Sequence, residues 1–380
     1  MKVKLEDIAE ITMGQSPKSN YYNYVGDGMP FLQGNRTFGR RYPIFDTYTT
    51  MVTKKAIAGD IIMSVRAPVG DLNYTPVDMC LGRGVCSIRM KNGNQDYLFY
   101  LLKNNVQQLI NKESGTVFGS VNRNDIAGLE LEIVEENKQS RIARMLSMID
   151  DKIDVNEKIN DNLEEQLLAY YRELFTSNAK SSWKAGTVAD LGNVVGGSTP
   201  SKKRNEYYTE HGIAWITPKD LSNNHSKFIT HGEIDITELG LANSSAVRMP
   251  PGTVLFSSRA PIGYIAIADG EVTTNQGFKS VVPFDEIGTA YVYCFLKENL
   301  IVIENMASGS TFKEISGSTM KVVPAIIPDI ETLSVFRDYA DVLFNQQRNN
   351  EAENRRLSAI RDSLLPKLMS GELDISNLDL

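Results

Sequence analysis

The sequence predicts an α+β protein made as a tandem repeat. Two homologous mixed α/β domains are each followed by a long helix, and the helices pair as an antiparallel coiled coil about a pseudo-twofold axis. Three observations predict this fold class: the spacing of glycine and proline, a motif that occurs twice, and a heptad in each helical segment. The 380 residues, 42% of them hydrophobic, are enough for two or three domains of ordinary globular composition.

Glycine and proline leave two long gaps in the chain. There are 28 glycines and 14 prolines, yet neither residue occurs between Gly128 and Gly186 or between Pro328 and Pro366. Because these residues interrupt regular structure more than any others, the gaps predict two long helices. The segments before each gap carry short β-branched runs closed by turn residues, as at 60–65, and these runs predict strands.

A repeated motif identifies the two copies. Ser-x-Arg-Ala-Pro-x-Gly occurs at 64–70 and 257–263, and Ser-Gly-[ST]-x-Phe occurs at 114–118 and 308–312. Gly-x-[ST]-Pro occurs near the start of each copy at a smaller offset, so we expect about ten extra residues in the second copy, between 220 and 245. The predicted parts are a first domain (1–135), a central helix (136–178), a second domain (179–328), a distal helix (329–371) and a tail (372–380).

Both helical segments carry a seam of apolar residues spaced by four and three, which is typical of coiled coils. Two asparagines interrupt each seam near its centre, and antiparallel pairing sets Asn156 opposite Asn354 and Asn160 opposite Asn350. Buried asparagine costs stability but fixes register, because a slip leaves amides unpaired. The alternative is that these asparagines face solvent. A helix of about 33 residues spans roughly 50 Å, so the helices would act as a stiff spacer between the domains. We expect Pro366 to break the last turn of the distal helix.

Few features of the sequence indicate catalysis. There is no Gly-Lys dipeptide for a phosphate-binding loop, and no Asn/Asp-Pro-Pro-Tyr/Phe of the amino-methyltransferase kind. The three histidines lack a Ser, Cys or metal-ligand partner at informative spacing, and all lie in the second copy. Three cysteines without metal-ligand spacing indicate neither a zinc site nor a disulfide framework. Paired carboxylates at 150–151 and 164–165 are interpreted as solvated helix faces. We therefore expect no catalytic, cofactor-binding or metal-binding residue.

Basic residues with neighbouring tyrosines remain as candidates for a binding surface. Such side chains suit phosphate contact and readout of base edges, so we expect them to bind DNA. The candidates are Lys18, Tyr21, Arg36, Arg40 and Arg41 in the first domain, and Lys202, Lys203, Arg204, Lys219 and Lys227 in the second. Arg66 and Arg259 of the repeated motif are candidates too, although each follows a strand and could brace a turn instead.

The whole chain resembles the specificity subunits of Type I restriction-modification systems. The resemblance rests on the tandem arrangement, on Gly-x-[ST]-Pro, [ST]-x-Arg-x-x-x-Gly and Ser-Gly-[ST] in order in both copies, and on Leu-Leu-Pro-Lys-Leu-Met-Ser-Gly-Glu-Leu at 364–373. It implies that each domain is a target recognition domain that reads one half of a split, asymmetric DNA site. It also implies that the helices set the spacing and dock two modification subunits, and that restriction subunits join the complex. S-adenosylmethionine, ATP and Mg are then expected on the partner subunits and not on this chain.

Two other readings stay open at this point: a nuclease or methyltransferase with an unrecognised site, and a coiled-coil adaptor that binds proteins or glycans. The net charge of −7 argues against a protein that coats DNA, but most of the excess acid lies in the helical segments, which leaves both domains near neutral. No apolar run approaches the roughly 18 residues of a membrane-spanning helix, so we expect a cytoplasmic protein without a membrane partner.

Overall fold

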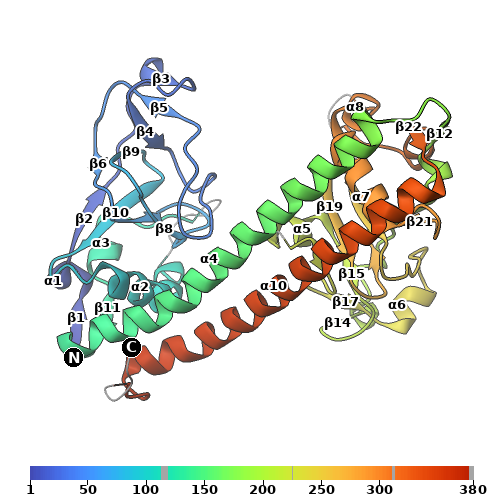
Figure 1. Ribbon diagram of the computed structural model, residues 1–380. Helices are drawn as coiled ribbons and strands as arrows, with labels where there is room; N and C mark the ends of the chain where they lie inside the picture. The colour runs from blue at the N-terminus through green and yellow to red at the C-terminus, as the bar shows by residue number, and fades with distance from the viewer. Residues whose placement is uncertain (113–118, 225, 310–312, 376–380) are drawn as a thin grey trace. The chain divides into compact units, whose positions relative to one another are not determined.

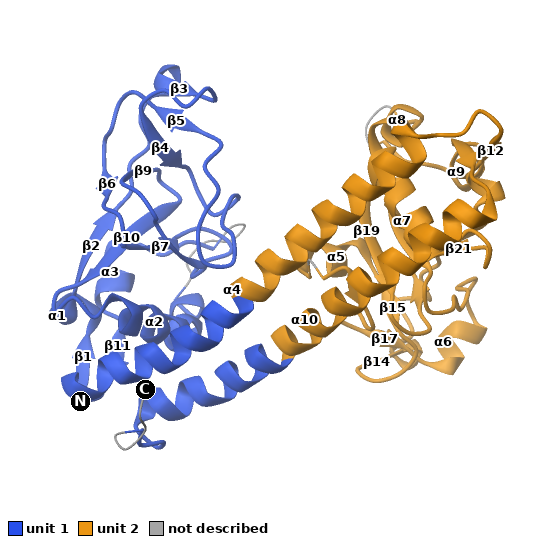
Figure 2. Cartoon of the chain, viewed as in Figure 1, with its two compact units in different colours: residues 1–153, 356–380 blue, residues 154–355 orange. Residues whose placement is uncertain are grey.

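A computed structural model describes residues 1–112, 119–224, 226–309 and 313–375. The chain forms two compact units, which Figure 2 shows in different colours. Unit 1 contains Met1–Ile153 and Arg356–Leu380, and unit 2 contains Asp154–Arg355. The two long helices, α4 (Glu136–Arg172) and α10 (Ile330–Ser370), each contribute one segment to both units.

The core of unit 1 is a four-stranded antiparallel sheet in the order β2-β10-β7-β8, followed in the chain by helix α2 (Figure 1). Helix α2 buries one nearly continuous apolar run, 97–102, in the same hydrophobic cluster as the inner face of the sheet. The elements are β2 (Ala9–Met13), β7 (Ile61–Ser64), β8 (Leu72–Tyr74), β10 (Val85–Met90) and α2 (Gln95–Ile110).

A second sheet of unit 1 has five short strands in the order β3-β5-β4-β9-β6, with β4 and β9 parallel. It packs around its own buried cluster, separate from the core beneath α2. A two-stranded ribbon of β1 and β11 joins the ends of the domain. The remaining elements are β1 (Lys2–Lys4), α1 (Leu5–Ile8), β3 (Tyr22–Asn23), β4 (Met29–Leu32), β5 (Tyr48–Thr49), β6 (Lys55–Ala56), β9 (Met79–Leu81), α3 (Arg123–Ala127) and β11 (Glu130–Glu132).

Unit 2 repeats this plan. Its main sheet has the order β13-β21-β18-β19-β16, in which β16 and β19 are parallel. Strand β15 pairs in parallel with β20, as β4 does with β9 in unit 1, and the ribbon is β12 with β22. The strands are β12 (Lys184–Thr187), β13 (Gly192–Gly196), β14 (Tyr208–Thr209), β15 (Trp215–Ile216), β16 (Phe228–Ile229), β17 (Asp235–Ile236), β18 (Val254–Ser258), β19 (Ile262–Ala268), β20 (Thr273–Thr274), β21 (Lys279–Pro283) and β22 (Pro324–Ile327). The helices are α5 (Pro218–Asn223), α6 (Glu238–Ala242), α7 (Thr289–Glu298), α8 (Leu300–Asn305) and α9 (Gly317–Lys321). Helices α5 and α6 and strand β16 have no counterpart in unit 1, and they lie in the region where the sequence predicts extra residues.

The repeated motif builds the same turn in both units. In unit 1 the Ser64 hydroxyl donates to the Pro68 carbonyl (2.7 Å), and in unit 2 the Ser257 hydroxyl donates to the Pro261 carbonyl (2.8 Å). The glycine that ends each motif has a positive φ, and a side chain there would collide with Val106 of α2 in unit 1 and with Leu300 of α8 in unit 2. The second repeated motif, at 114–118 and 308–312, lies largely outside the described residues.

Helices α4 and α10 run antiparallel within each unit. In unit 1, α4 contributes Ile142 and Leu146 to the same core as Leu365 and Leu368 of α10. In unit 2, apolar residues at 167 and 171 of α4 share a core with residues 333, 336, 340 and 343 of α10. A π-helical turn at Glu173–Ser177 follows α4.

The expectation that Pro366 breaks the last turn of α10 is wrong, because the helix continues to Ser370. A proline inside a helix removes one hydrogen bond and crowds the preceding turn. Leu365, Leu368 and Met369, on both sides of the proline, are buried in the core of unit 1. Burial of these three side chains offsets the cost of the proline.

Candidate functional site

The first domain gathers basic side chains around a pocket of about 630 Å³. Lys18 and Arg36, both predicted from the sequence, line it together with Arg83, which was not predicted. All three residues are exposed. Two tyrosines, Tyr22 and Tyr24, line the same pocket. Cationic and aromatic side chains in one hollow are suited to contact with phosphates and bases.

Close backbone packing places Arg83 at this pocket. A side chain at Gly82 would lie 2.6 Å from the carbonyl oxygen of Leu32, and one at Gly84 would lie 2.4 Å from that of Gln33. Only glycine permits the segment around Arg83 to pack this closely against the strand that carries the pocket. The Gly-Arg-Gly pattern at 82–84 was the signal in the sequence that could have indicated this residue.

The loop that starts each domain is held by its tyrosines. The Tyr22 hydroxyl donates to the Pro17 carbonyl (2.9 Å), and Tyr208 donates to Pro200 (2.5 Å) in the second copy. Tyr21, the predicted candidate, precedes Tyr22 and is 38% exposed. These contacts fix the loops that carry the basic residues without using the basic residues themselves.

Ion pairs engage several of the predicted residues. Arg36 pairs with Asp46 at the rim of the first pocket, and hydrogen bonds from Arg36 and Thr47 hold the pKa of the Asp46 carboxyl below its usual value. Arg204 and Lys219 form exposed pairs with glutamates, at 3.4 Å and 2.7 Å. Exposed pairs of this kind contribute little stability and open readily. They leave these cations accessible to a ligand of higher charge.

Four further candidates divide into two pairs. Lys202 and Lys203 are exposed. Arg66 is also exposed, whereas Arg259 is half-buried and lies 3.5 Å from the carboxylate of Glu314. The structure therefore places Arg259 where it braces a turn, and Arg66 where it faces solvent.

Arg40 and Arg41 point toward helix α4 within unit 1. Arg40 donates to the side chain of Asp150 (3.1 Å) and to its backbone carbonyl (2.7 Å), and Arg41 pairs with Asp151. Their guanidinium groups thus bind the helix, and this placement argues against the DNA contact predicted for them.

Lys227 occupies a comparable place in unit 2. Its side chain is 8% exposed, and its amine pairs with Glu164 of α4 and donates to Gln347 of α10 (2.6 Å). The amine also lies 4.8 Å from the ring centres of Tyr293 and Phe344. Burial lowers the pKa of this amine, against the attraction of Glu164. The burial of Lys227 against two helices is in conflict with its predicted DNA contact.

The interpretation of the paired carboxylates as solvated helix faces is wrong for one member of each pair. Asp150 is 5% exposed and accepts from Tyr100 (2.7 Å) and Arg361 (2.7 Å). Burial opposes ionisation of Asp150, but these hydrogen bonds and nearby cations hold its pKa below the usual value. Glu164 is held ionised in the same way by Lys227 and Lys297. Asp151 and Glu165 are exposed, as expected.

A polar layer crosses the helix pair in unit 2. The Asn156 amide donates to the Asn354 side-chain oxygen (2.8 Å), and the Asn350 amide donates to that of Asn160 (2.8 Å). These are the two pairs that the sequence predicts. Gln347, one turn along α10, donates to the backbone carbonyl of Asn160 (2.9 Å). Asn156 and Asn350 are almost fully buried, so they are not solvent-facing.

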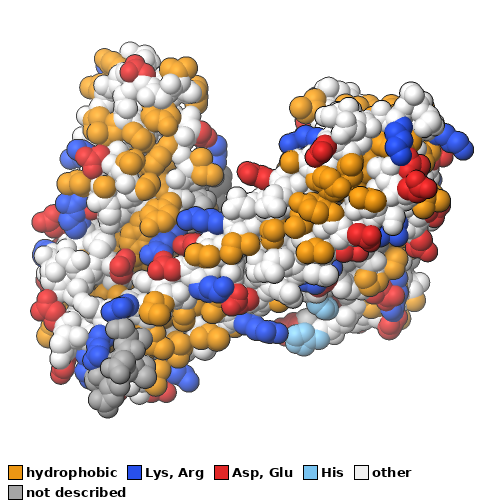
Figure 3. Space-filling model, viewed as in Figure 1, with side chains coloured by type: hydrophobic (Ala, Val, Ile, Leu, Met, Phe, Trp, Pro, Cys, Tyr) orange, Lys and Arg blue, Asp and Glu red, His pale blue; other side chains and the backbone are white. Residues whose placement is uncertain are grey.

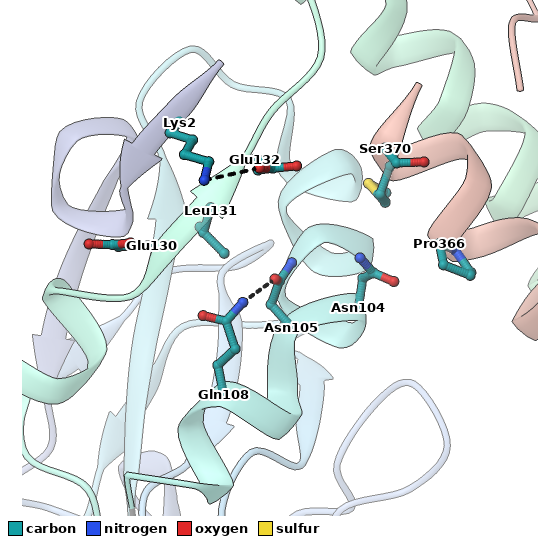
Figure 4. Close-up of a pocket in the computed structure, with 10 residues that line it drawn as sticks. Lys2, Asn104, Asn105, Gln108, Glu130, Leu131, Glu132, Pro366 and Ser370 are labelled. Carbon is teal, nitrogen blue, oxygen red and sulfur yellow. Dashed lines mark hydrogen bonds and ion pairs between the residues drawn. The ribbon is translucent and has the colours of Figure 1, made fainter. Parts of the chain in front are cut away.

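A further pocket in unit 1, of about 320 Å³, has no reactive set of side chains (Figure 4). Asn104, Asn105 and Gln108 of α2 line it with residues of the β1–β11 ribbon and the end of α10. Lys2 and Glu132 form an exposed ion pair at its edge (3.5 Å). Amides and a surface ion pair offer neither an activated nucleophile nor a general base.

The described residues contain no group of three His, Cys, Asp or Glu side chains placed to hold a metal ion. Cys80, Cys86 and Cys294 are buried and unpaired, and burial raises the pKa of the Cys86 thiol to about 12. His231 contacts Asp235 (2.9 Å), a partner that the sequence did not indicate, and His225 lies outside the described residues. Among the helices in the described part of the chain, none is long and apolar enough to cross a membrane.

The fold and these surfaces define a class of protein: a duplicated binding domain whose two copies are each attached to a pair of long helices. The family described as Type I restriction modification DNA specificity domain matches residues 1–165 and 180–360. The chain belongs to this family, the specificity subunits of Type I restriction-modification systems, and carries two of its domains in tandem.

Individual relatives support the assignment. The chain is 38% identical over 187 residues to the Type I restriction enzyme MjaIX specificity subunit of Methanocaldococcus jannaschii, a match to 48% of this chain and 43% of that protein. It therefore spans less than half the length of that relative. The HindI specificity subunit of Haemophilus influenzae is 25% identical over 408 residues, a match to 84% of this chain and 88% of that protein. A solved S subunit from M. genitalium shares the fold, with a TM-score of 0.55, 17% identity, and coverage of 99% and 96% of the two chains.

Proposed function

We propose that this chain is the DNA-binding specificity subunit of a Type I restriction-modification complex and is not itself an enzyme. Each domain reads one half of a bipartite, asymmetric DNA site, and the helices set the distance between the half-sites. The observation that carries the proposal is the duplication of one domain frame with different exposed polar side chains in matched positions. A duplicated domain fold supplies two binding surfaces, and the different side chains on these surfaces make them recognise different DNA sequences.

The clearest matched difference lies beside the loop that starts each domain. The parallel strand pairs align Arg83 of the first domain with Gln276 of the second, because Phe31 pairs with Cys80 and Trp215 with Thr273. Both Arg83 and Gln276 are exposed. Arginine suits the two acceptors on a guanine edge, whereas glutamine suits the donor and acceptor of adenine. The two domains are therefore expected to prefer different bases where these residues reach the DNA.

The polar layer supports the role of the helices as a spacer. Its two asparagine pairs are satisfied only in one register, because a shift of either helix leaves buried amides without partners. Helix α4 has 37 residues and α10 has 41, so each is about 55 to 60 Å long. Paired helices of fixed register and length can define a distance.

Exposed apolar residues on the helices support docking of two modification subunits. Met148, Val155 and Ile159 follow one face of α4 and are at least 38% exposed. Val335, Tyr339 and Val342 follow one face of α10 and are at least 37% exposed. Met148 and Val342 are equivalent in the repeat, so two copies of one partner would find similar contacts. Hydrophobic side chains are visible between charged ones on the surface of the helices (Figure 3).

The catalytic steps belong to the partners in this proposal. Modification subunits would bind S-adenosylmethionine and methylate adenine, and restriction subunits would use ATP and Mg for translocation and cleavage, all in the cytoplasm. The chain would supply DNA specificity and the docking surface. No other candidate function is favoured by a specific feature of the two domains.

Methylation mapping tests the proposal. The full chain is expressed with its modification subunit in a host free of other adenine methylation, and methylated adenines are mapped by single-molecule sequencing. We expect one split site whose two halves differ in sequence. A continuous site, a strict palindrome, or methylation by this chain alone would contradict the proposal.

A further inference from the structure

In each domain, a basic side chain from an equivalent connection between strands contacts the long helices. In unit 1 the loop joins β4 to β5 and carries Arg40 and Arg41. In unit 2 the corresponding connection, from β15 to β17, contains α5 and β16, and Lys227 lies in the loop between these two elements. The connections share no motif, and the second is the longer one, yet both place a basic side chain against a carboxylate of α4.

The first clamp consists of Arg40, Arg41, Asp150, Asp151 and Arg361. Asp150 is its centre, because one carboxylate accepts from Arg40 of the domain and from Arg361 of α10. The side chains of Arg40, Arg361 and Asp150 are 28%, 11% and 8% exposed, so the centre of the clamp is largely shielded from water. One domain and both helix segments of unit 1 meet at this carboxylate.

The second clamp consists of Lys227, Glu164, Gln347 and Glu351. The Lys227 amine reaches α4 through Glu164 and α10 through Gln347. Glu351 accepts the backbone N–H of Lys227 (2.7 Å) and of Phe228 (3.2 Å). Strand β16, which begins at Phe228, is thereby attached to α10 at its first residue. Again one domain and both helix segments of the unit meet at one buried polar group.

Such clamps determine geometry more than they add stability. A buried ion pair recovers little more than its desolvation cost, and apolar residues of similar size would often stabilise the contact as well. A charge removed from its partner in this environment is strongly unfavourable, however, so other angles between the domain and the helices are excluded. The two units reach the same arrangement with different residues, which is what a shared positioning role requires.

We propose that Arg40, Arg41 and Lys227 are positioning residues: each clamp fixes the angle of its domain on the helices and so restricts the gap between the two half-sites. The inference rests on the function proposed above. It assigns no base contact to these residues. Their loss is therefore expected to change the permitted gap and leave the half-site sequences as they are.

The test uses the full chain with its modification subunit and a plasmid library in which the gap between the half-sites varies by one or two base pairs. The variants are Arg40→Gln with Arg41→Gln for the first clamp and Lys227→Met for the second. Relative to the wild type, we expect methylation at gaps one base pair too long or too short to rise about tenfold. Lys55→Met is the matched control, because Lys55 forms an exposed ion pair with Asp78 inside the first domain and touches no helix residue of a clamp.

Each outcome decides one question. If the wild type methylates no split site, the proposed function fails. If it does and the clamp variants keep its strict gap, the positioning role is wrong. If the clamp variants lose all methylation, the charge-swapped pair Arg41→Asp with Asp151→Arg, together with Lys227→Arg, must restore methylation at the wild-type gap. Failure of those rescue variants would overturn the inference.

Discussion

Replacement of Lys227 by methionine removes the positive charge of the second clamp and keeps most of the side-chain volume. Loss of one member of a buried ion pair typically costs 3 to 5 kcal/mol, because the other charge stays buried without compensation. Glu164 retains Lys297 (2.7 Å) and the Tyr293 hydroxyl (2.8 Å), so the cost falls at the lower end of that range. We expect unit 2 to lose about 3 kcal/mol of stability.

Hydrogen exchange measures this loss unit by unit. A single unfolding transition is not expected of a chain with two compact units, so one midpoint would not report on unit 2 alone. A loss of about 3 kcal/mol should accelerate exchange of the most protected amides of unit 2 about a hundredfold and leave those of unit 1 unchanged. Lys219→Met, which removes the exposed pair with Glu233, is the control and should have little effect.

The double variant Lys227→Met with Glu164→Gln should exchange more slowly than Lys227→Met alone, because it also removes the buried carboxylate that has lost one of its two cations. The amine of Lys297, whose side chain is 35% exposed, can stay hydrated without that carboxylate. Equal effects of Lys227→Met and Lys219→Met, or acceleration spread evenly over both units, would refute the reasoning.

Three more predictions follow from the polar layer, the first clamp and the first pocket. Asn160→Leu with Asn350→Leu should slow hydrogen exchange of the most protected amides of unit 2 but allow a shifted register, detectable as a second set of cross-links between cysteines placed on the two helices. The pKa of Asp150 is lower in the folded than in the unfolded chain, so its ionisation stabilises unit 1 above the ordinary carboxyl pKa of about 4. This stability is lost as pH falls toward the pKa of the folded state. Asp150→Asn should therefore reduce the loss of stability at acid pH in a circular-dichroism titration. In binding assays of the assembled complex, Lys18→Gln should weaken binding to all sequences and reduce the salt slope by about one, whereas Arg83→Gln should relax preference at one position of one half-site. A uniform loss from Arg83→Gln would mean that it contacts phosphate only.

Periodicity and repetition made much of the fold predictable. Long helices follow from the absence of glycine and proline, and the asparagine pairs follow from their equal distance to the centre of each seam. The extra residues of the second domain, though not the helices and strand that they form, follow from a change in the offset between repeats. These features depend on local composition or on the spacing of residues along the chain, so a single sequence is enough to reveal them.

The clamps could not be predicted in the same way. Asp150 and Glu164 look like solvated helix residues because helix periodicity shows a face but not what packs on it. Arg40 and Lys227 look like DNA contacts because a basic loop residue is usually exposed, and only tertiary packing turns these loops inward. Pro366 was misjudged for a related reason: burial of the surrounding leucines outweighs the local preference of proline.

A matched deletion in the two helices tests whether the domains recognise the half-site sequences and the helices set the distance between the half-sites. The deleted segments are residues 152–158 of α4, between the clamp residues Asp151 and Glu164, and residues 352–358 of α10, between Glu351 and Arg361. Removal of both segments spares both clamps and the Asn160–Asn350 pair. Seven residues correspond to about 10 Å of helix, or about three base pairs of DNA. Methylation mapping of the deleted chain should return the same two half-sites separated by a gap about three base pairs shorter. An unchanged gap, or new half-site sequences, would contradict the proposal that the domains recognise the half-sites and the helices set their separation.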